Sequence, residues 1–99
     1  MIITIDDKVL AYLNKKKSSD ITIGLRAAKA GWCGQILIPE VVLTAPGELT
    51  YYEKITLKGI NIYIENASYK ELDKLDLQLE KHLFITKIVP YGMDVKTLR

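Results

Sequence analysis

Apolar and polar residues alternate over three stretches of the chain, residues 21–28, 60–65 and 75–80. A period of two is typical of half-buried β-strands, because successive side chains of a strand point to opposite faces of the sheet. The apolar positions of these stretches are expected to point into one core between sheet and helix. They are Ile21, Ile23, Leu25, Ile60, Ile62, Ile64, Leu75, Leu77 and Leu79.

Other β-rich runs complete the predicted sheets, at residues 2–5, 35–43, 50–57 and 84–89. The turn Lys58-Gly59 separates one of these runs from residues 60–65 and predicts a β-hairpin. Pro39 cannot donate a backbone hydrogen bond, so its run belongs at a sheet edge or a bulge. Pro90 is expected to close the last strand.

Two segments depart from the period of two. Asp6 can supply an N-cap carboxylate, and apolar residues recur at helical spacing after it, which predicts a helix over about residues 7–17. Residues 66–74 are polar and helix-tolerant. The expected fold is therefore mainly β, in the α+β class: one compact domain over residues 1–99, with antiparallel or mixed sheets, one N-terminal helix and one short helical turn.

The composition is that of an ordinary globular domain, with 99 residues, 48% of them apolar and 26% charged. The formal charge of +2 is too small to indicate nucleic acid or a membrane as a partner. The dense basic run Lys15-Lys16-Lys17 falls at the predicted end of the first helix, where the helix dipole favours cations. Contact with an acidic partner is the alternative interpretation of this run.

The location of the protein is constrained by two features of the sequence. No segment approaches the roughly 20 apolar residues of a membrane-spanning helix, and acidic residues near the N-terminus interrupt any apolar stretch typical of a signal peptide. The single cysteine, Cys33, cannot form an internal disulfide, which agrees with a reducing compartment. We therefore expect a cytoplasmic protein.

Few residues could carry catalysis. The sequence contains no phosphate-binding or dinucleotide-binding glycine pattern, no paired-histidine metal motif and no nucleophile elbow, so we expect no enzyme. The carboxylates of Glu40, Glu53 and Glu65 are expected to be solvated. His82 is the only imidazole and cannot build a metal site alone.

The segment Gly31-Trp32-Cys33-Gly34 is the most unusual in the chain. Two glycines permit a tight turn that presents a thiol and an aromatic ring to solvent. Lys29 and Arg26 are near enough in sequence to stabilise a thiolate if they point the same way. In the alternative interpretation, Cys33 packs as a small hydrophobe and Trp32 covers the sheet edge.

Several local segments carry a family resemblance, in addition to the order of the elements from about Ile3 to Pro90. They are residues 3–6, Gly24-Leu25-Arg26, the cysteine loop at residues 31–34, Lys58-Gly59, residues 62–68, and Leu72-Asp73 with Leu77. In order and spacing these segments resemble the HesB/IscA-type iron–sulfur biosynthesis domain.

The sequence also departs from that family. Members that carry clusters place one cysteine in the first loop and a Cys-Gly-Cys pair in the C-terminal tail, but here no cysteine follows Pro90. Aligning the two loop glycines puts Trp32 at the usual cysteine position and Cys33 one residue later. A related subgroup of HesB-like proteins has adjacent Cys-Cys or Cys-selenocysteine there, so the resemblance assigns Cys33 to the second member of such a pair.

The resemblance implies a protein that binds iron or a labile iron–sulfur cluster at a homodimer interface. Cys33 would be the sole protein thiolate ligand per chain, with Gly31, Trp32 and Gly34 as loop contacts, and iron–sulfur assembly or client proteins would be the partners. Neither nucleic acid nor a membrane is expected as a partner.

Two other classes of function stay open. One is a non-metal interaction module of the same fold, which uses the cysteine loop and the tyrosines Tyr51, Tyr52 and Tyr63, expected to be exposed, for partner contact. The other is a thiol redox protein that forms mixed disulfides at Cys33, against which the lack of a resolving cysteine counts.

Overall fold

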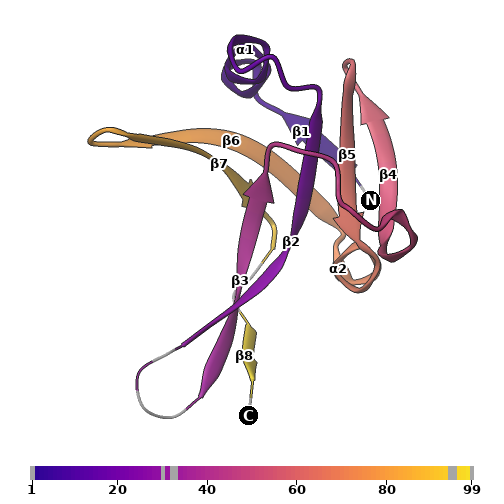
Figure 1. The fold of residues 1–99 in the computed structure, drawn as a ribbon, viewed down its shortest axis with the longest axis vertical. Coiled ribbons are helices and arrows are strands. Elements are labelled where there is room, and N and C mark those ends of the chain that lie inside the picture. The colour runs from indigo at the N-terminus through magenta and orange to yellow at the C-terminus, as the bar shows by residue number, and fades with distance from the viewer. Residues whose placement is uncertain (1, 30, 32–33, 94–95, 99) are drawn as a thin grey trace.

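The computed structural model describes residues 2–29, 31, 34–93 and 96–98. In this part of the chain, strands dominate and form two sheets that pack around one core (Figure 1). The elements in chain order are β1 (Ile2–Ile5), α1 (Asp7–Lys15), β2 (Asp20–Lys29), β3 (Gln35–Val42), the 3-10 turn η1 (Leu49–Tyr51), β4 (Tyr52–Leu57), β5 (Ile60–Glu65), α2 (Asn66–Glu71), β6 (Lys74–His82), β7 (Ile85–Tyr91) and β8 (Lys96–Leu98).

The two sheets are both mixed, as the sequence predicted. The first has the strand order β1-β6-β7, and the second the order β4-β5-β2-β3-β8. β1 runs parallel to β6, and β2 runs parallel to β5, while the remaining neighbours pair antiparallel. The predicted hairpin of β4 and β5 is confirmed, with Lys58-Gly59 as its two-residue turn.

The first helix begins as predicted and ends two residues earlier. The Asp6 carboxylate accepts the backbone N–H of Lys8 at 2.8 Å and so caps the N-terminus. At the other end Lys17 takes a left-handed backbone conformation, with φ 56°. The N–H groups of Lys17 and Ser18 then donate to the carbonyls of Asn14 and Leu13, a Schellman motif that ends the helix.

The core lies between α1 and the two sheets, and it contains most of the predicted positions. Seven of the nine are buried, while Leu25 and Leu79 are half-buried. Leu25 lies where β2 leaves the core and pairs with β3 alone, opposite Pro39. α1 adds Val9 and Leu13, both fully buried.

Both strand prolines lie at sheet edges. At Pro39, β3 pairs with β2 on one side, while β8 reaches only residues 35–37, so the predicted edge position is confirmed. Pro90 was expected to close the last strand, but β7 continues to Tyr91 and Pro90 pairs with Leu77. The edge position of β7 explains why this strand tolerates the missing N–H.

Among the described residues, no helix has the length and apolar character needed to cross a membrane.

Candidate functional site

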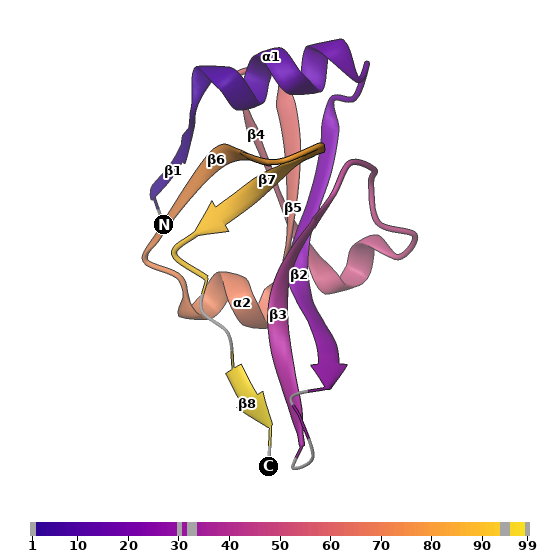
Figure 2. The ribbon, with the colours of Figure 1, turned by 90° about the vertical axis from the view of Figure 1, so that its left-hand side faces the viewer.

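The glycine loop lies at the far end of the β2–β3 ribbon, which extends well beyond the core (Figure 2). Its last strand pair is Lys29 with Gln35. Gly31 and Gly34 are both exposed, with φ values of 67° and 147° that few other residues adopt. Both bracketing glycines are therefore exposed and have unusual backbone angles, as predicted.

Trp32 and Cys33 lie outside the described residues. The assignments of Cys33 as metal or cluster ligand and of Trp32 as a loop contact therefore stay predictions. The same holds for the alternative in which Cys33 packs as a buried hydrophobe.

The end of the chain returns to the base of this loop. β8 pairs antiparallel with the start of β3, so that Leu98 lies opposite Gln35, the residue directly after Gly34. Figure 2 shows β8 beside the lower part of β3, close to the C-terminus. The fold thus brings the cysteine loop and the C-terminal tail together although they are far apart in sequence. Sequence reasoning missed β8, because Lys96-Thr97-Leu98 is too short to show a period.

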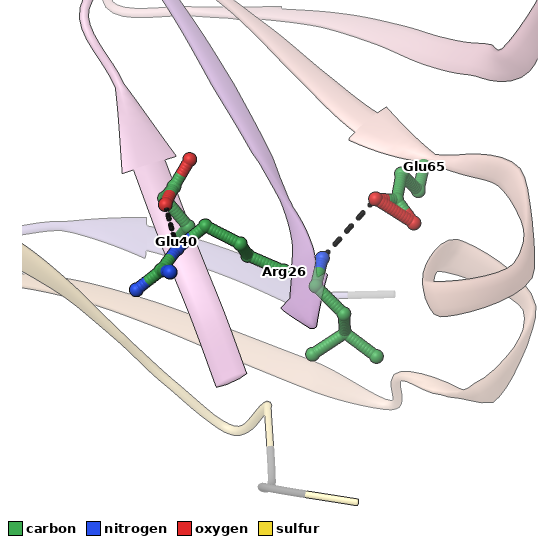
Figure 3. A network of polar contacts seen from close by, with 4 residues as sticks. Arg26, Glu40 and Glu65 are labelled. Carbon is green, nitrogen blue, oxygen red and sulfur yellow. Dashed lines mark hydrogen bonds and ion pairs between the residues drawn. The ribbon is translucent and has the colours of Figure 1, made fainter. Parts of the chain in front are cut away.

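The two basic residues near the loop, Arg26 and Lys29, differ in their surroundings. The Arg26 guanidinium forms an ion pair with Glu40 of the neighbouring strand (Figure 3), and the two side chains are 58% and 42% exposed. The Arg26 charge is therefore largely offset by Glu40. Lys29 is exposed at the last strand pair before the loop.

Glu65 was expected to be solvated, and the structure corrects this. The parallel ladder between β2 and β5 ends at Ile23 and Ile64, because the chain turns into α2 after Glu65. The half-buried Glu65 carboxylate instead accepts the N–H of Leu25 at 3.1 Å (Figure 3).

Gly24 makes this contact possible. A Cβ atom at Gly24 would overlap the carboxylate of Glu65. A glycine inside a strand often marks such a close approach, so Gly24 was the available sequence signal. Of the other two carboxylates, Glu40 is ion-paired and Glu53 is exposed as expected.

A groove lies on the outer face of the five-stranded sheet, between the 44–48 loop, η1 and the start of α2. It encloses about 730 Å³, and Tyr51, Tyr52, Glu48 and Glu65 are among its lining residues. Hydrogen bonds from the Thr50 side chain and backbone lower the pKa of Glu48 below its ordinary value. The groove combines tyrosine rings with acidic groups, so it is suited to a cationic or aromatic group.

The tyrosines named as contact residues differ in exposure. Tyr51 is 66% exposed and Tyr52 is half-buried, but Tyr63 is only 8% exposed, so its predicted exposure was wrong. Tyr63 lies on the central strand β5, where the Lys54 ammonium sits 6.0 Å from the centre of its ring. A large side chain on the outward face of an interior strand can thus be buried by side chains of the adjacent strands.

The described residues hold no group of three or more His, Cys, Asp or Glu side chains that could bind a metal ion. His82 is exposed, next to the turn between β6 and β7. It is therefore no part of a multidentate site in this region of the chain.

The fold is similar to that of two solved structures. The crystal structure of IscA with the [2Fe-2S] cluster superposes with a TM-score of 0.69 and 14% identity, over 99% of this chain and 100% of that chain. Escherichia coli SufA, described as involved in biosynthesis of iron–sulfur clusters, gives a TM-score of 0.51 and 10% identity, over 92% and 80%. These identities establish a HesB/IscA-like fold and no more.

Comparison of the sequence with curated proteins gave no match. The sequence model of the CC/Se motif containing family matches residues 1–93, which is nearly the whole chain and includes the glycine loop. The protein therefore belongs to the CC/Se motif containing family and has the fold of IscA.

Proposed function

We propose that this protein binds iron or a labile iron–sulfur cluster through Cys33 and delivers it to client proteins. The observation that carries the proposal is the return of β8 to the base of the glycine loop. The tail strand therefore lies beside the residue that directly follows the loop in which Cys33 stands in the sequence. The proposal also draws support from the solved IscA structure, which holds a [2Fe-2S] cluster on the same fold.

The family description gives the loop further weight. A CC/Se motif needs adjacent cysteines or a selenium-containing residue, and this chain has one cysteine, in the step Trp32-Cys33. We assign that step to the family motif, with Trp32 in place of its first member. Lys29, exposed beside the loop, would favour the thiolate form of Cys33.

The number of cysteine ligands limits how a cluster could be bound. Two Cys33 thiolates in a homodimer supply half of the four cysteine ligands that a cluster usually takes, and no cysteine follows Pro90. Glutathione, another thiol or a partner protein would complete the set. The cluster would therefore be labile, as suits a carrier in a reducing, cytoplasmic compartment, and no catalysed reaction is assigned to the chain.

The test is anaerobic incubation of the protein with iron and sulfide, followed by ultraviolet–visible spectroscopy with and without glutathione. The parent protein should develop cluster absorption that depends on the added thiol, and Cys33→Ser should abolish it. Trp32→Cys is the matched gain-of-function variant, because it raises the loop thiolates from two to four per dimer. It should give a cluster that persists without glutathione.

An interaction module is the second candidate function. The observation in its favour is the groove on the outer sheet face, where Tyr51 is 66% exposed beside Glu48. Failure of the parent protein to bind iron or a cluster under all these conditions would favour this candidate. The thiol redox function stays a prediction that rests on Cys33 alone.

A further inference from the structure

The turn between β6 and β7 holds the three most exposed of the large apolar side chains among the described residues. Leu83 is 90% exposed, Phe84 is 99% exposed and Ile85 is 67% exposed. These three consecutive residues are called the apolar tip below. Three adjacent large apolar side chains in water are unfavourable for an isolated protein and mark an interaction site.

The hairpin carries the apolar tip away from the core. β1 pairs with β6 only as far as Leu77, so the ribbon beyond that point consists of β6 and β7 alone. Figure 1 shows this ribbon reaching outward past both sheets. The apolar tip is thus convex and accessible, and it contributes no packing to the core.

The backbone conformation of the turn is unfavourable for a leucine. His82 pairs with Ile85, which leaves Leu83 and Phe84 as a two-residue turn. Leu83 has φ 55°, a conformation for which such turns normally use Gly, Asn or Asp. Folding therefore does not favour a leucine here, so its presence indicates a role for the side chain at the surface.

Basic side chains flank the tip on both faces of the ribbon. Lys81 pairs with Thr86 on one face, and Lys87 lies on the other face opposite Glu80. The Tyr12 hydroxyl donates to the Thr86 carbonyl at 3.5 Å, and the Lys16 ammonium lies 5.6 Å from the centre of the Tyr12 ring.

The three ammonium groups of Lys16, Lys81 and Lys87 are called the lysine collar below. All three residues are exposed, and none forms an ion pair with another described residue. The overall charge of +2 does not reveal this local concentration of lysines, so no membrane partner was expected from the net charge.

We propose that the apolar tip inserts into the interface of an anionic lipid bilayer while the lysine collar contacts the headgroups. Apolar side chains buried at the headgroup boundary together with nearby cations are the combination that holds peripheral proteins on anionic membranes. A second copy of the chain is a poorer occupant, because two tips in contact would bring two lysine collars together. A bilayer also accepts a convex tip, whereas a protein partner needs a matching concave pocket.

The experiment is flotation of the full-length protein with phosphatidylcholine vesicles and with vesicles of phosphatidylcholine and phosphatidylglycerol in equal parts. The protein should float with the anionic vesicles, float much less with the neutral ones, and be released by salt. Phe84→Ser should weaken binding about tenfold or more, since it removes a large buried apolar surface.

Leu83→Gly separates binding from folding. Glycine suits the backbone at this position, so the variant should be at least as stable as the parent and yet lose vesicle binding. Leu49→Ser is the matched control, because it removes an apolar side chain that is 57% exposed on the η1 turn, at the opposite side of the molecule in Figure 1. This control should bind like the parent.

Three outcomes would overturn the proposal. They are no binding of the folded parent to anionic vesicles, binding that both tip variants retain, and concentration-dependent self-association in sedimentation that Leu83→Gly removes. The last result would identify the tip as a contact between copies of the chain.

Discussion

The β2–β3 ribbon and the β6–β7 ribbon each end in a turn that contains a residue with positive φ, but the type of residue differs. In the β2–β3 loop the residue is Gly31, with φ 67°, and in the β6–β7 hairpin it is Leu83, with φ 55°. Glycine adopts this conformation at little cost, so local folding explains Gly31. Leucine does not, and its side chain is 90% exposed. The backbone conformation alone therefore accounts for Gly31. It does not account for Leu83, which points to a role for the exposed leucine side chain.

The largest expected effect comes from the core that holds both ribbons. Ile62 is fully buried on β5, so Ile62→Ala should lower the free energy of unfolding by about 2 to 5 kcal/mol through lost burial and a cavity. Ile85→Ala, at the hairpin tip, is the matched control and should change it by less than about 0.5 kcal/mol. Urea unfolding measures both. An Ile62→Ala loss below about 0.5 kcal/mol would contradict the burial of this site.

The next effect concerns the start of the β2–β3 ribbon. Glu65→Ala leaves the Leu25 N–H without its acceptor and should cost about 1 to 3 kcal/mol. Glu65→Gln retains an acceptor oxygen and should recover most of that loss, while Glu53→Ala, at an exposed position, should stay within about 0.5 kcal/mol. Equal losses for the Ala and Gln variants would show that the charge, not the hydrogen bond, stabilises this point.

The two turns themselves should respond with opposite signs. Gly31→Ala should destabilise by about 1 kcal/mol, because open space surrounds the site but the backbone conformation disfavours a Cβ. Leu83→Gly should leave stability unchanged or raise it by up to about 1 kcal/mol. Thermal melts of the two variants provide the comparison. A loss of stability in Leu83→Gly would mean that folding does favour the leucine.

The smallest effect is a pH dependence in the three-stranded sheet. Hydrogen bonds from Gln78 and Thr4 hold the pKa of Asp76 below its ordinary value of 3.8. A carboxyl whose pKa is lower in the folded state than in the unfolded state stabilises the fold. This stability is fully present above the unfolded-state pKa and is lost as the pH falls through the folded-state pKa. Asp76→Asn should therefore lose less stability than the parent between about pH 5 and pH 2.5. Identical acid profiles would show that the carboxylate contributes nothing.

Much of the fold was predictable because it depends on local alternation. The period of two located the strands that carry Ile21, Ile62 and Leu77, and the turn Lys58-Gly59 predicted the hairpin of β4 and β5. What escaped prediction depends on contacts between distant segments. The β3–β8 pairing is non-local, and the burial of Tyr63 depends on the strands beside it.

The candidate site was predictable only in part. The glycine pattern predicted the exposure and the unusual backbone angles of Gly31 and Gly34, since these depend on local backbone freedom. The approach of the tail to the loop was not, because only the three-dimensional pairing of Gln35 with Leu98 creates it. The apolar tip also went unnoticed, because residues 84–89 show an ordinary strand composition.

We propose that Cys33 binds iron or a cluster with an incomplete protein ligand set. The most direct test of this proposal is the absorption spectrum of the protein after anaerobic incubation with iron and sulfide. We predict cluster absorption that requires added thiol, disappears in Cys33→Ser and becomes independent of thiol in Trp32→Cys. A durable cluster in the parent without added thiol, or a cluster that survives Cys33→Ser, would contradict the account.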